Sequence, residues 1–292
     1  MLLYLLRRLI YALPIMFGVA LVCFSLVHVA PGDPLVSVLP PDASVELQNQ
    51  LRTLYGFDRS LPEQFVSWIW RALQGDLGTS IATSRPVTAE VFKAVVNTLR
   101  LAVLATLIGF VLGSLFGFVA GYFQNSWVDK AASFTAVLGV SVPHYWLGMV
   151  LVIIFAAQLN WLPAITMSVI PMGIVARTVR ALVAEILAQE FVVGLRAKGL
   201  TDLGIFLHVV KNAAPTALAV MGLQLGYLLG GSILIETVFA WPGTGFLLNA
   251  AIFQRDLPLL QGTILVLALF FVALNLVVDV VQSFLDPRIQ RA

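Results

Sequence analysis

The sequence has few charged residues and a single cysteine. Only 11% of its 292 residues are charged and 60% are hydrophobic, whereas soluble domains carry about a quarter charged residues. So few charges cannot cover a water-exposed surface, and the composition therefore indicates an integral membrane protein. The cysteine, Cys23, lies inside an apolar run, which excludes both a disulfide framework and a cysteine metal cluster.

Motifs of enzymes and of nucleic-acid binding are also missing. The chain contains no GxxxxGK[ST] string to hold ATP phosphates, no HExxH, no GxSxG and no basic stripe with interleaved aromatics. His28, His144 and His208 do not have metal-ligand spacing. We therefore expect no catalytic site, no cofactor or metal bound by this chain, and no nucleic-acid partner.

Apolar runs dominate what is present. A helix needs about 20 apolar residues to cross the bilayer core, and six stretches meet or approach this length. They run from about Leu9 to Ala30, Leu99 to Tyr122, Ala131 to Gln158, Leu162 to Val179, Ala213 to Ile235 and Gly262 to Leu285. The sequence therefore predicts an all-α membrane protein with six transmembrane helices.

The first run follows Arg7 and Arg8, so a secretory signal peptide is an alternative interpretation. The run is longer than the usual signal core of about 7–15 residues. A proline also directly follows Ala30, the only plausible small cleavage residue. We therefore expect an uncleaved first span.

Lys and Arg in the short loops predict the orientation, because cytoplasmic loops carry the excess of these residues. The opposite short loops hold only Arg255. The predicted cytoplasmic side collects Arg7, Arg8, Lys130, Arg177, Arg180, Arg196, Lys198, Lys211, Arg288 and Arg291. We expect both termini in the cytoplasm.

Residues 31–97 form the only sizeable region outside the predicted spans. Val45 to Tyr55 and Leu61 to Leu73 show helical spacing, and the second is rich in aromatics that suit the headgroup layer. We predict an extracytoplasmic helical cap here, between the first span (residues 1–30) and a five-span core (residues 98–292). A shorter external stretch, Glu236 to Pro258, contains the turn signal WPGTG.

Two polar residues and a set of glycines lie inside the predicted spans. His144 and Asp279 are candidates for the translocation path, although hydrogen bonding to a neighbouring helix is the favoured interpretation for both. The glycines repeat every four residues in the second predicted span and predict close helix packing, with a second subunit as one candidate neighbour. They are Gly109, Gly113, Gly117 and Gly121.

A polar, net basic segment, Glu190 to Pro215, separates two apolar runs. Helical spacing is present in Glu185 to Phe191 and in Val192 to Lys198, Gly199 interrupts it, and Leu203 to Lys211 is helical again. Leu195 and Leu200 present apolar side chains beside the cations. Such a segment suits docking into a partner's groove, but an interfacial loop with snorkelling cations fits equally well.

At these residues the chain resembles a known family. EFVVGLRAKGLTDLGIFLHVVKNAAP is similar to the cytoplasmic EAA loop of permeases in the dipeptide/oligopeptide/nickel branch of ABC importers. Other matching strings occur in the family's order along nearly the whole chain. They are LLRRL, HVAPGDP at His28 to Pro34, GDLGTS at Gly75 to Ser80, NTL at Asn97 to Leu99, SVPHYWLG at Ser141 to Gly148, ETVFAWPGTG at Glu236 to Gly245 and DPRIQ at Asp286 to Gln290.

The resemblance implies a type I importer permease of the bacterial inner membrane. It implies a second permease subunit, homologous or identical, two ABC ATPase subunits that bind ATP and magnesium, and an extracytoplasmic solute-binding protein. The segment 190–215 would be the ATPase-coupling loop. The residues carried over are Glu190, Leu195, Arg196, Ala197, Lys198, Gly199, Leu200, Asn212 and Pro215.

The chain departs from the family pattern in two places. Val193, Gly194 and Leu195 stand where relatives have an Arg-Thr-Ala run, and Gly194 would loosen the helix by up to about 1 kcal/mol relative to alanine. The chain also runs almost directly from Trp161 to Ala164 into the fourth predicted span, where many relatives have a sizeable external loop.

Peptide import is the leading hypothesis for the substrate, because that branch is dominated by peptide carriers. Import of nickel or a metal chelate is the alternative within the same architecture. An ion-coupled secondary transporter is less favoured, because it would need intramembrane ionisable pairs and often internal repeats.

Overall fold

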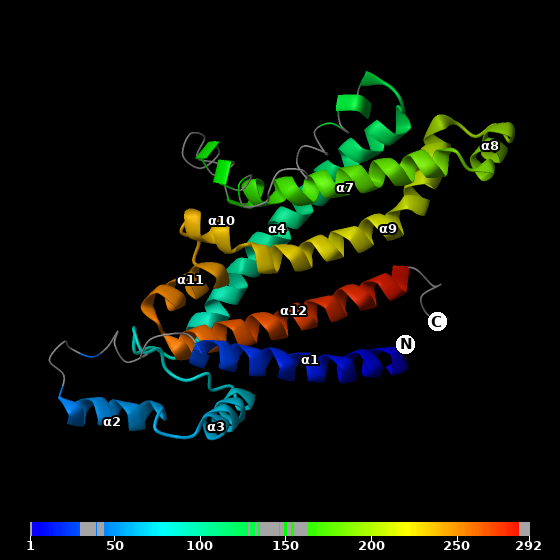
Figure 1. Cartoon of the computed structure of the whole chain (residues 1–292). Coiled ribbons are helices and arrows are strands. Elements are labelled where there is room, and N and C mark those ends of the chain that lie inside the picture. The colour runs from blue at the N-terminus through cyan, green and yellow to red at the C-terminus, as the bar shows by residue number, and fades with distance from the viewer. Residues whose placement is uncertain are drawn as a thin grey trace. The chain divides into compact units, whose positions relative to one another are not determined.

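The computed structural model describes residues 2–29, 39, 44–127, 129–131, 134, 146, 149–150, 153–154 and 163–285. The long regular elements among these residues are all helices (Figure 1). They are α1 (Leu2–Val29), α2 (Val45–Tyr55), α3 (Leu61–Leu73), α4 (Val87–Tyr122), α7 (Pro163–Leu187), α8 (Glu190–Ala197), α9 (Asp202–Gly231), α10 (Ile233–Val238), α11 (Thr244–Gln254) and α12 (Leu257–Leu285).

Four of these helices are long and apolar enough to cross a membrane. They are α4, α7, α9 and the Leu257–Val278 part of α12. In α1 a shorter apolar stretch, Ile10–Ser25, lies within a helix of 28 residues. The all-α membrane architecture is confirmed, and the predicted third span, 131–158, lies largely outside the described residues.

Among the described helices, α1, α4, α9 and α12 begin earlier than hydropathy indicates, and the difference is largest for α4 and α9. The second span belongs to α4, which begins at Val87 rather than Leu99, and the fifth belongs to α9, which begins at Asp202 rather than Ala213. Charged residues such as Glu90 and Lys93 lower the hydropathy of the first turns of α4 without interrupting its helical period. Val87, Val91 and Val95 recur every four residues there and are all buried.

The helices α2 and α3, both predicted within residues 31–97, have the bounds that their sequences predict. In α2 the Ser44 hydroxyl accepts a hydrogen bond from the Leu47 amide at 3.2 Å, and Gly56 ends the helix with a φ of 75°. At the start of α3 the Ser60 amide donates to the Glu63 carboxylate at 3.1 Å. Capping side chains and a left-handed glycine are local signals, so sequence alone places these boundaries well.

The chain divides into two compact units, and the divisions fall within α4, between α10 and α11, and within α12. One unit consists of Met1–Thr98 with Ala240–Ala273, and the other of Leu99–Phe239 with Leu274–Ala292. We refer to them as the first and the second unit and describe each by itself.

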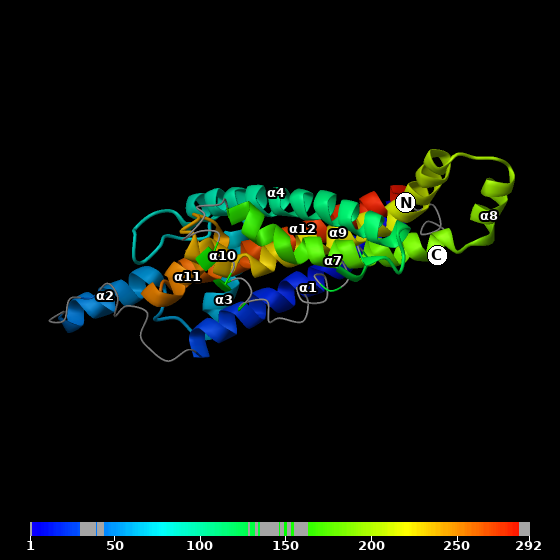
Figure 2. The ribbon, with the colours of Figure 1, turned by 90° about the horizontal axis from the view of Figure 1, so that it is seen from above.

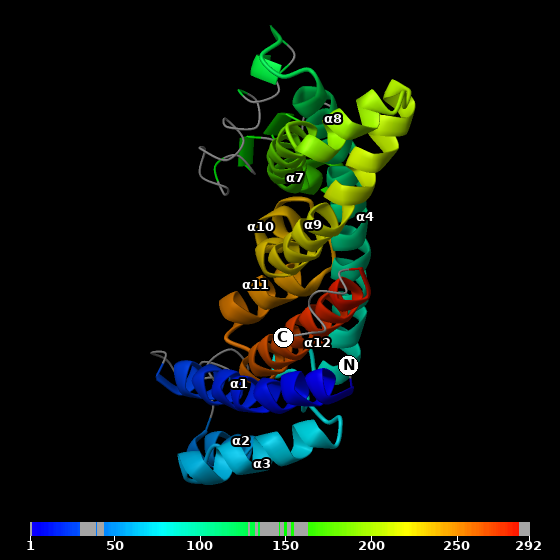
Figure 3. The ribbon, with the colours of Figure 1, turned by 90° about the vertical axis from the view of Figure 1, so that its right-hand side faces the viewer.

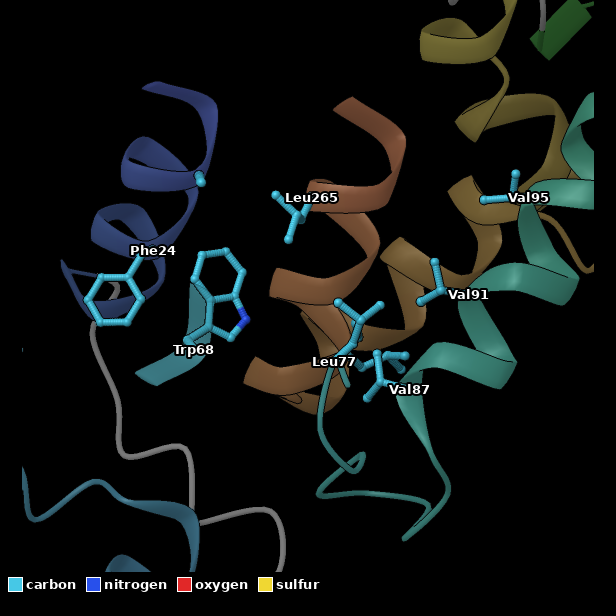
Figure 4. Close-up of a cluster of buried hydrophobic side chains, with 10 residues drawn as sticks. Phe24, Trp68, Leu77, Val87, Val91, Val95 and Leu265 are labelled. Carbon is cyan, nitrogen blue, oxygen red and sulfur yellow. The ribbon is translucent and has the colours of Figure 1, made fainter. Parts of the chain in front are cut away.

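Aromatic side chains join α3 to α1 in the first unit. The ring centroids of Phe24 and Phe65 are 5.3 Å apart, and those of Phe24 and Trp68 are 6.1 Å apart. Figure 3 shows α2 and α3 on one side of α1, and Figure 4 shows Phe24 and Trp68 among the buried cluster that continues to Leu77 and Val87. The predicted cap therefore packs on the first helix through a shared apolar core.

The GDLGTS string forms a loop that folds back on the start of α4. Gly75 and Gly78 have φ values of 81° and 85°, a region that strongly favours glycine. The Val87 amide donates to the Gly78 carbonyl at 2.9 Å, and the Thr88 hydroxyl donates to the Gly75 carbonyl at 2.8 Å. These bonds account for the spacing of the two glycines.

In the second unit, α4 packs against α7 of the same chain through glycines that repeat every four residues. We call this set the glycine ladder of α4; it consists of Gly109, Gly113, Gly117 and Gly121. A methyl group at Gly113 would lie 2.6 Å from the Met172 carbonyl oxygen, and one at Gly121 would lie 2.7 Å from that of Arg180. Contacts advance in the same direction along both helices, so α4 and α7 run parallel. The predicted packing face is confirmed, but its neighbour is α7 rather than a second subunit, because α7 leaves no space for another helix at these glycines.

Candidate functional site

The segment 190–215 contains a short helix followed by the start of a long one. α7 ends at Leu187, α8 covers Glu190–Ala197, and α9 begins at Asp202. Figures 1 and 2 show α8 where the chain turns from the end of α7 back into α9. The predicted order of helix, glycine and helix is confirmed, and α9 continues without interruption into the membrane-spanning part. The helix predicted over Glu185 to Phe191 is wrong at Ala188 and Gln189, where α7 has ended and α8 has not yet begun.

The end of α8 explains the RAKGL spacing. The Gly199 amide donates to the Arg196 carbonyl at 2.9 Å, and the Leu200 amide donates to the Leu195 carbonyl at 3.2 Å. With Gly199 at a φ of 77°, this pair of bonds is a Schellman motif. Leu195 and Leu200 belong to one apolar cluster, as the hydrophobic contact of that motif requires.

α9 begins immediately afterwards, with a capping residue of its own. The Thr201 hydroxyl accepts a hydrogen bond from the Gly204 amide at 3.3 Å, and Asp202 lies in the first turn. Farther along, the Asn212 side chain donates to the His208 carbonyl at 2.8 Å. Pro215 lies inside α9. Two helix termini thus meet within four residues of sequence, which gives the turn a defined geometry.

One buried side chain joins α8 to both long helices. Val192 is 1% exposed and belongs to the cluster that contains Val183 of α7 and Ile205 of α9. The remaining buried members are Val175, Val179, Ile186, Val209, Ala213 and Ala217. Because interiors are closely packed, a displacement of α8 displaces α7 and α9 with it.

Most other side chains of α8 and its C-cap are exposed, and they include both apolar and charged groups. Val193 is 63% exposed, and Glu190, Arg196, Ala197 and Lys198 are also exposed. Within the part of the chain that the structure describes, no ion pair engages Glu190, Arg196 or Lys198. We call these five residues the outer face of α8. Its composition suits a protein groove better than an apolar lipid environment.

The other predicted polar candidates are not placed in a site. His144 lies outside the described residues, and for Asp279 the structure describes only the backbone, in α12. The described residues contain no group of three or more His, Cys, Asp or Glu that could hold a metal ion. The roles of His144 and Asp279 stay predictions.

An ion pair that the sequence did not indicate lies in the second unit. Arg180 of α7 donates through Nε and Nη2 to the two carboxylate oxygens of Asp129, at 2.8 and 2.9 Å. The Asp129 carboxylate also accepts from the Asn125 amide at 3.0 Å. The one sequence signal for this pair is that Asp129, an acidic residue, lies beside Lys130 in a loop on the predicted cytoplasmic side, where Lys and Arg predominate.

Two family-like strings that are far apart in sequence meet in the first unit. The Trp241 indole donates to the Asn97 carbonyl at 3.2 Å, and the Asn97 side chain donates to the Pro242 carbonyl at 2.9 Å. The Thr244 amide donates to the Thr98 hydroxyl at 2.8 Å. NTL and WPGTG therefore form one hydrogen-bonded contact, which neither string predicts alone.

These features define a multi-pass helical membrane protein whose distinctive surface is a short, exposed helix between two membrane-spanning helices. The chain belongs to the family described as "Binding-protein-dependent transport system inner membrane component", whose model matches residues 109–291. The model for the N-terminal part of such membrane components matches residues 1–107. The protein is therefore an inner-membrane permease of the ABC importer class.

Curated relatives match over almost their whole length. The glutathione transport system permease protein GsiC from a strain of Escherichia coli is 36% identical over 304 residues, covering 99% of both chains. The dipeptide transport system permease protein DppB from Alkalihalophilus pseudofirmus is 35% identical over 332 residues, covering 99% of this chain and 100% of the relative. The family expectation from the sequence motifs is confirmed.

Proposed function

We propose that this permease carries dipeptides or oligopeptides across the cytoplasmic membrane by alternating access, driven by ATP hydrolysis on separate subunits. The observation that supports this most strongly is the geometry of α8, which is joined to α7 and α9 by Val192 and exposes a basic and apolar outer face. Such a helix can receive a movement from a partner and pass it to two membrane-spanning helices.

The proposed partners are two ABC ATPase subunits, a second permease subunit and an extracytoplasmic solute-binding protein. ATP and magnesium would be bound by the ATPases, because this chain has no phosphate-binding motif. With both termini in the cytoplasm, α8 lies on the ATPase side of the membrane. The outer face of α8, with Gly199 ending the helix, would lie in a groove of one ATPase.

Alternating access requires two conformations that the ATPase contacts stabilise to different degrees. Closure of the ATPase pair would move α8, and the packing of Val192 against Val183 and Ile205 would transmit that movement to α7 and α9. ATP hydrolysis would remove the ATPase contacts that favour the conformation adopted on closure, and the permease would return to its starting conformation.

The names of the relatives support a peptide substrate. One relative is named for glutathione and the other for dipeptides, and both are short molecules with amide bonds. Nickel or a metal chelate is the alternative cargo. The described residues contain no group of three or more His, Cys, Asp or Glu that would favour it.

The outer face of α8 can be tested by charge reversal in the assembled transporter. We expect the double variant Arg196→Glu, Lys198→Glu to lose most peptide uptake and most stimulation of ATPase activity by the loaded binding protein, because both cations would contact the ATPase. Uptake and ATPase activity would be measured in proteoliposomes, with the amount of bound ATPase measured by pull-down.

Lys130→Glu is the matched control, because Lys130 is exposed and lies on the same predicted side of the membrane. It should leave uptake and ATPase stimulation close to those of the unmodified protein. Wild-type activity in the double variant would exclude α8 as the coupling element. Uptake by the permease without any ATPase would instead contradict the importer mechanism.

A further inference from the structure

A cavity of about 510 Å³ lies within the first unit. Its apolar lining includes Phe24 of α1, Trp68 of α3 and Leu77 of the loop before α4. Figure 4 shows these three side chains, with Trp68 between Phe24 and Leu77. Cavities of about 300–1,000 Å³ are of the size that holds small organic molecules. None of its described lining residues belongs to α8, so the cavity is separate from the outer face of α8.

Among the described lining residues, positive charges outnumber negative ones. Arg59 and Arg71 both line the cavity and are exposed. Among the described residues neither guanidinium group has a hydrogen-bonding or ion-pairing partner. Asp76, the one carboxylate among the described lining residues, accepts a hydrogen bond from the Gly78 amide at 2.8 Å. The described lining thus carries two cations without an ionic partner and one carboxylate that already accepts a hydrogen bond, a composition that favours an anion.

The cavity lies where two apolar helices of the first unit end. Phe24 lies five residues before the end of α1 at Val29. Leu257, Pro258 and Gln261 line the cavity from the first turns of α12, at the start of its membrane-spanning part. Because helices that cross a bilayer end in its headgroup layer, a cavity at the ends of α1 and α12 would lie at the depth of the lipid headgroups.

The neighbouring surface of α3 also suits that depth. Val66, Trp70 and Leu73 are 66%, 64% and 76% exposed, although α3 also carries Glu63 and Arg71. Exposed aromatic and aliphatic side chains beside charged ones are typical of helices that lie in the membrane interface. A lipid is present there at high local concentration, whereas a soluble anion is not.

We propose that this cavity binds the headgroup of an anionic phospholipid. Arg59 and Arg71 hold its phosphate, and the glycerol and the first acyl carbons contact Phe24 and Trp68. Arginine suits this role because its planar fork matches the oxygens of a phosphate. With the predicted orientation, the bound lipid belongs to the extracytoplasmic leaflet and joins α1 and α3 to the start of α12.

The test measures lipid binding by the purified full-length permease. The protein is exposed to phosphatidylglycerol or to phosphatidylcholine, and retained lipid is counted by native mass spectrometry. We expect preferential retention of phosphatidylglycerol. In the double variant Arg59→Gln, Arg71→Gln we expect affinity to fall on the order of tenfold per arginine, the effect of one charge-assisted hydrogen bond.

The double variant Arg52→Gln, Arg85→Gln removes the same charge from the same unit at positions that do not line the cavity. It should retain phosphatidylglycerol like the unmodified protein. Equal losses in the two double variants would overturn the proposal, because the effect would then be one of net charge. Unchanged retention in the Arg59, Arg71 variant would overturn it directly.

Two competitors separate a lipid from other anions. Inorganic phosphate carries the charge without the apolar groups, and a short peptide is a candidate cargo of the transporter. We expect neither to displace phosphatidylglycerol at millimolar concentration. Displacement by phosphate would assign the cavity to free phosphate, and displacement by the peptide would assign it to transported solute; either result would overturn the lipid proposal.

Discussion

Asp129 and Arg180 form a two-point ion pair that joins the segment after α4 to α7. The side chain of Asp129 is 5% exposed and that of Arg180 is 37% exposed, so water screens the pair on one side only. The Asn125 amide also donates to the Asp129 carboxylate, at 3.0 Å. One carboxylate therefore determines both the turn after α4 and the position of that turn on α7.

Asp129→Ala should reduce the stability of the permease by about 1–3 kcal/mol, because it removes a charge-assisted pair and the acceptor of a backbone amide. Thermal unfolding in detergent measures the change. Lys130→Gln is the control, since Lys130 is exposed and adjacent, and it should change the free energy of unfolding by no more than about 0.5 kcal/mol. Equal effects would mean that the pair contributes nothing specific.

Gly113→Ala should destabilise the second unit by about 1–3 kcal/mol, the usual cost of overpacking a closely packed interior. The added methyl group would lie 2.6 Å from the Met172 carbonyl oxygen and 3.0 Å from Val175. Gly173→Ala on α7 is the matched change, because no atom lies within 4 Å of the added methyl group. It should stabilise the helix by up to about 1 kcal/mol. Thermal unfolding that ranks the two variants in the opposite order would contradict the packing of α4 on α7.

The same substitution at Gly194 and Gly199 should have opposite effects. Both glycines have open space around an added methyl group, but Gly194 lies inside α8 whereas Gly199 has a φ of 77°. Gly194→Ala should stabilise α8 by up to about 1 kcal/mol, and Gly199→Ala should cost about 1–2 kcal/mol. Hydrogen exchange of the amides in 190–200 reports the sign of each change. Slower exchange in both variants would rule out the left-handed turn at Gly199.

Asp256→Ala should be among the most destabilising polar substitutions in the first unit, at about 2–4 kcal/mol. The buried carboxylate accepts from the Ser80 hydroxyl, from the Ala82 amide at 3.2 Å and from the Leu259 amide at the start of α12 at 3.1 Å. Asp58→Ala, at an exposed position, serves as the control and should have little effect. Similar unfolding temperatures for the two variants would show that the network does not stabilise the fold.

Sequence predicted the parts of the protein that local chemistry specifies. The bounds of α2 and α3 follow from Ser44, Gly56 and Ser60, which satisfy helix ends through neighbours only a few residues away. Gly199 was expected to interrupt the coupling segment, and it does so in a left-handed turn. The membrane class and the helical architecture followed from composition and apolar runs. The bilayer thickness sets the length of a spanning helix, and the absence of water there requires the backbone to form its hydrogen bonds internally.

Sequence failed where the answer depends on residues far apart in the chain. Hydropathy placed the start of the second span at Leu99, because Glu90 and Lys93 lower the mean hydropathy of the preceding turns. The valines that repeat along those turns are buried in a core shared with α1, α3 and α12. Asn97 and Trp241, or Asp129 and Arg180, are joined by side-chain hydrogen bonds that no local pattern records.

By itself, the sequence determined that this is a helical membrane permease with a basic, glycine-interrupted segment between two of its helices. Only the tertiary structure decided that α7 packs against the glycines of α4, that Val192 packs α8 on α7 and α9, and that Arg59 and Arg71 line one cavity. The physical reason is the range of the interactions. Hydropathy, caps and turn preferences act over a few residues, whereas close packing and charge pairing act between side chains that the fold alone brings together.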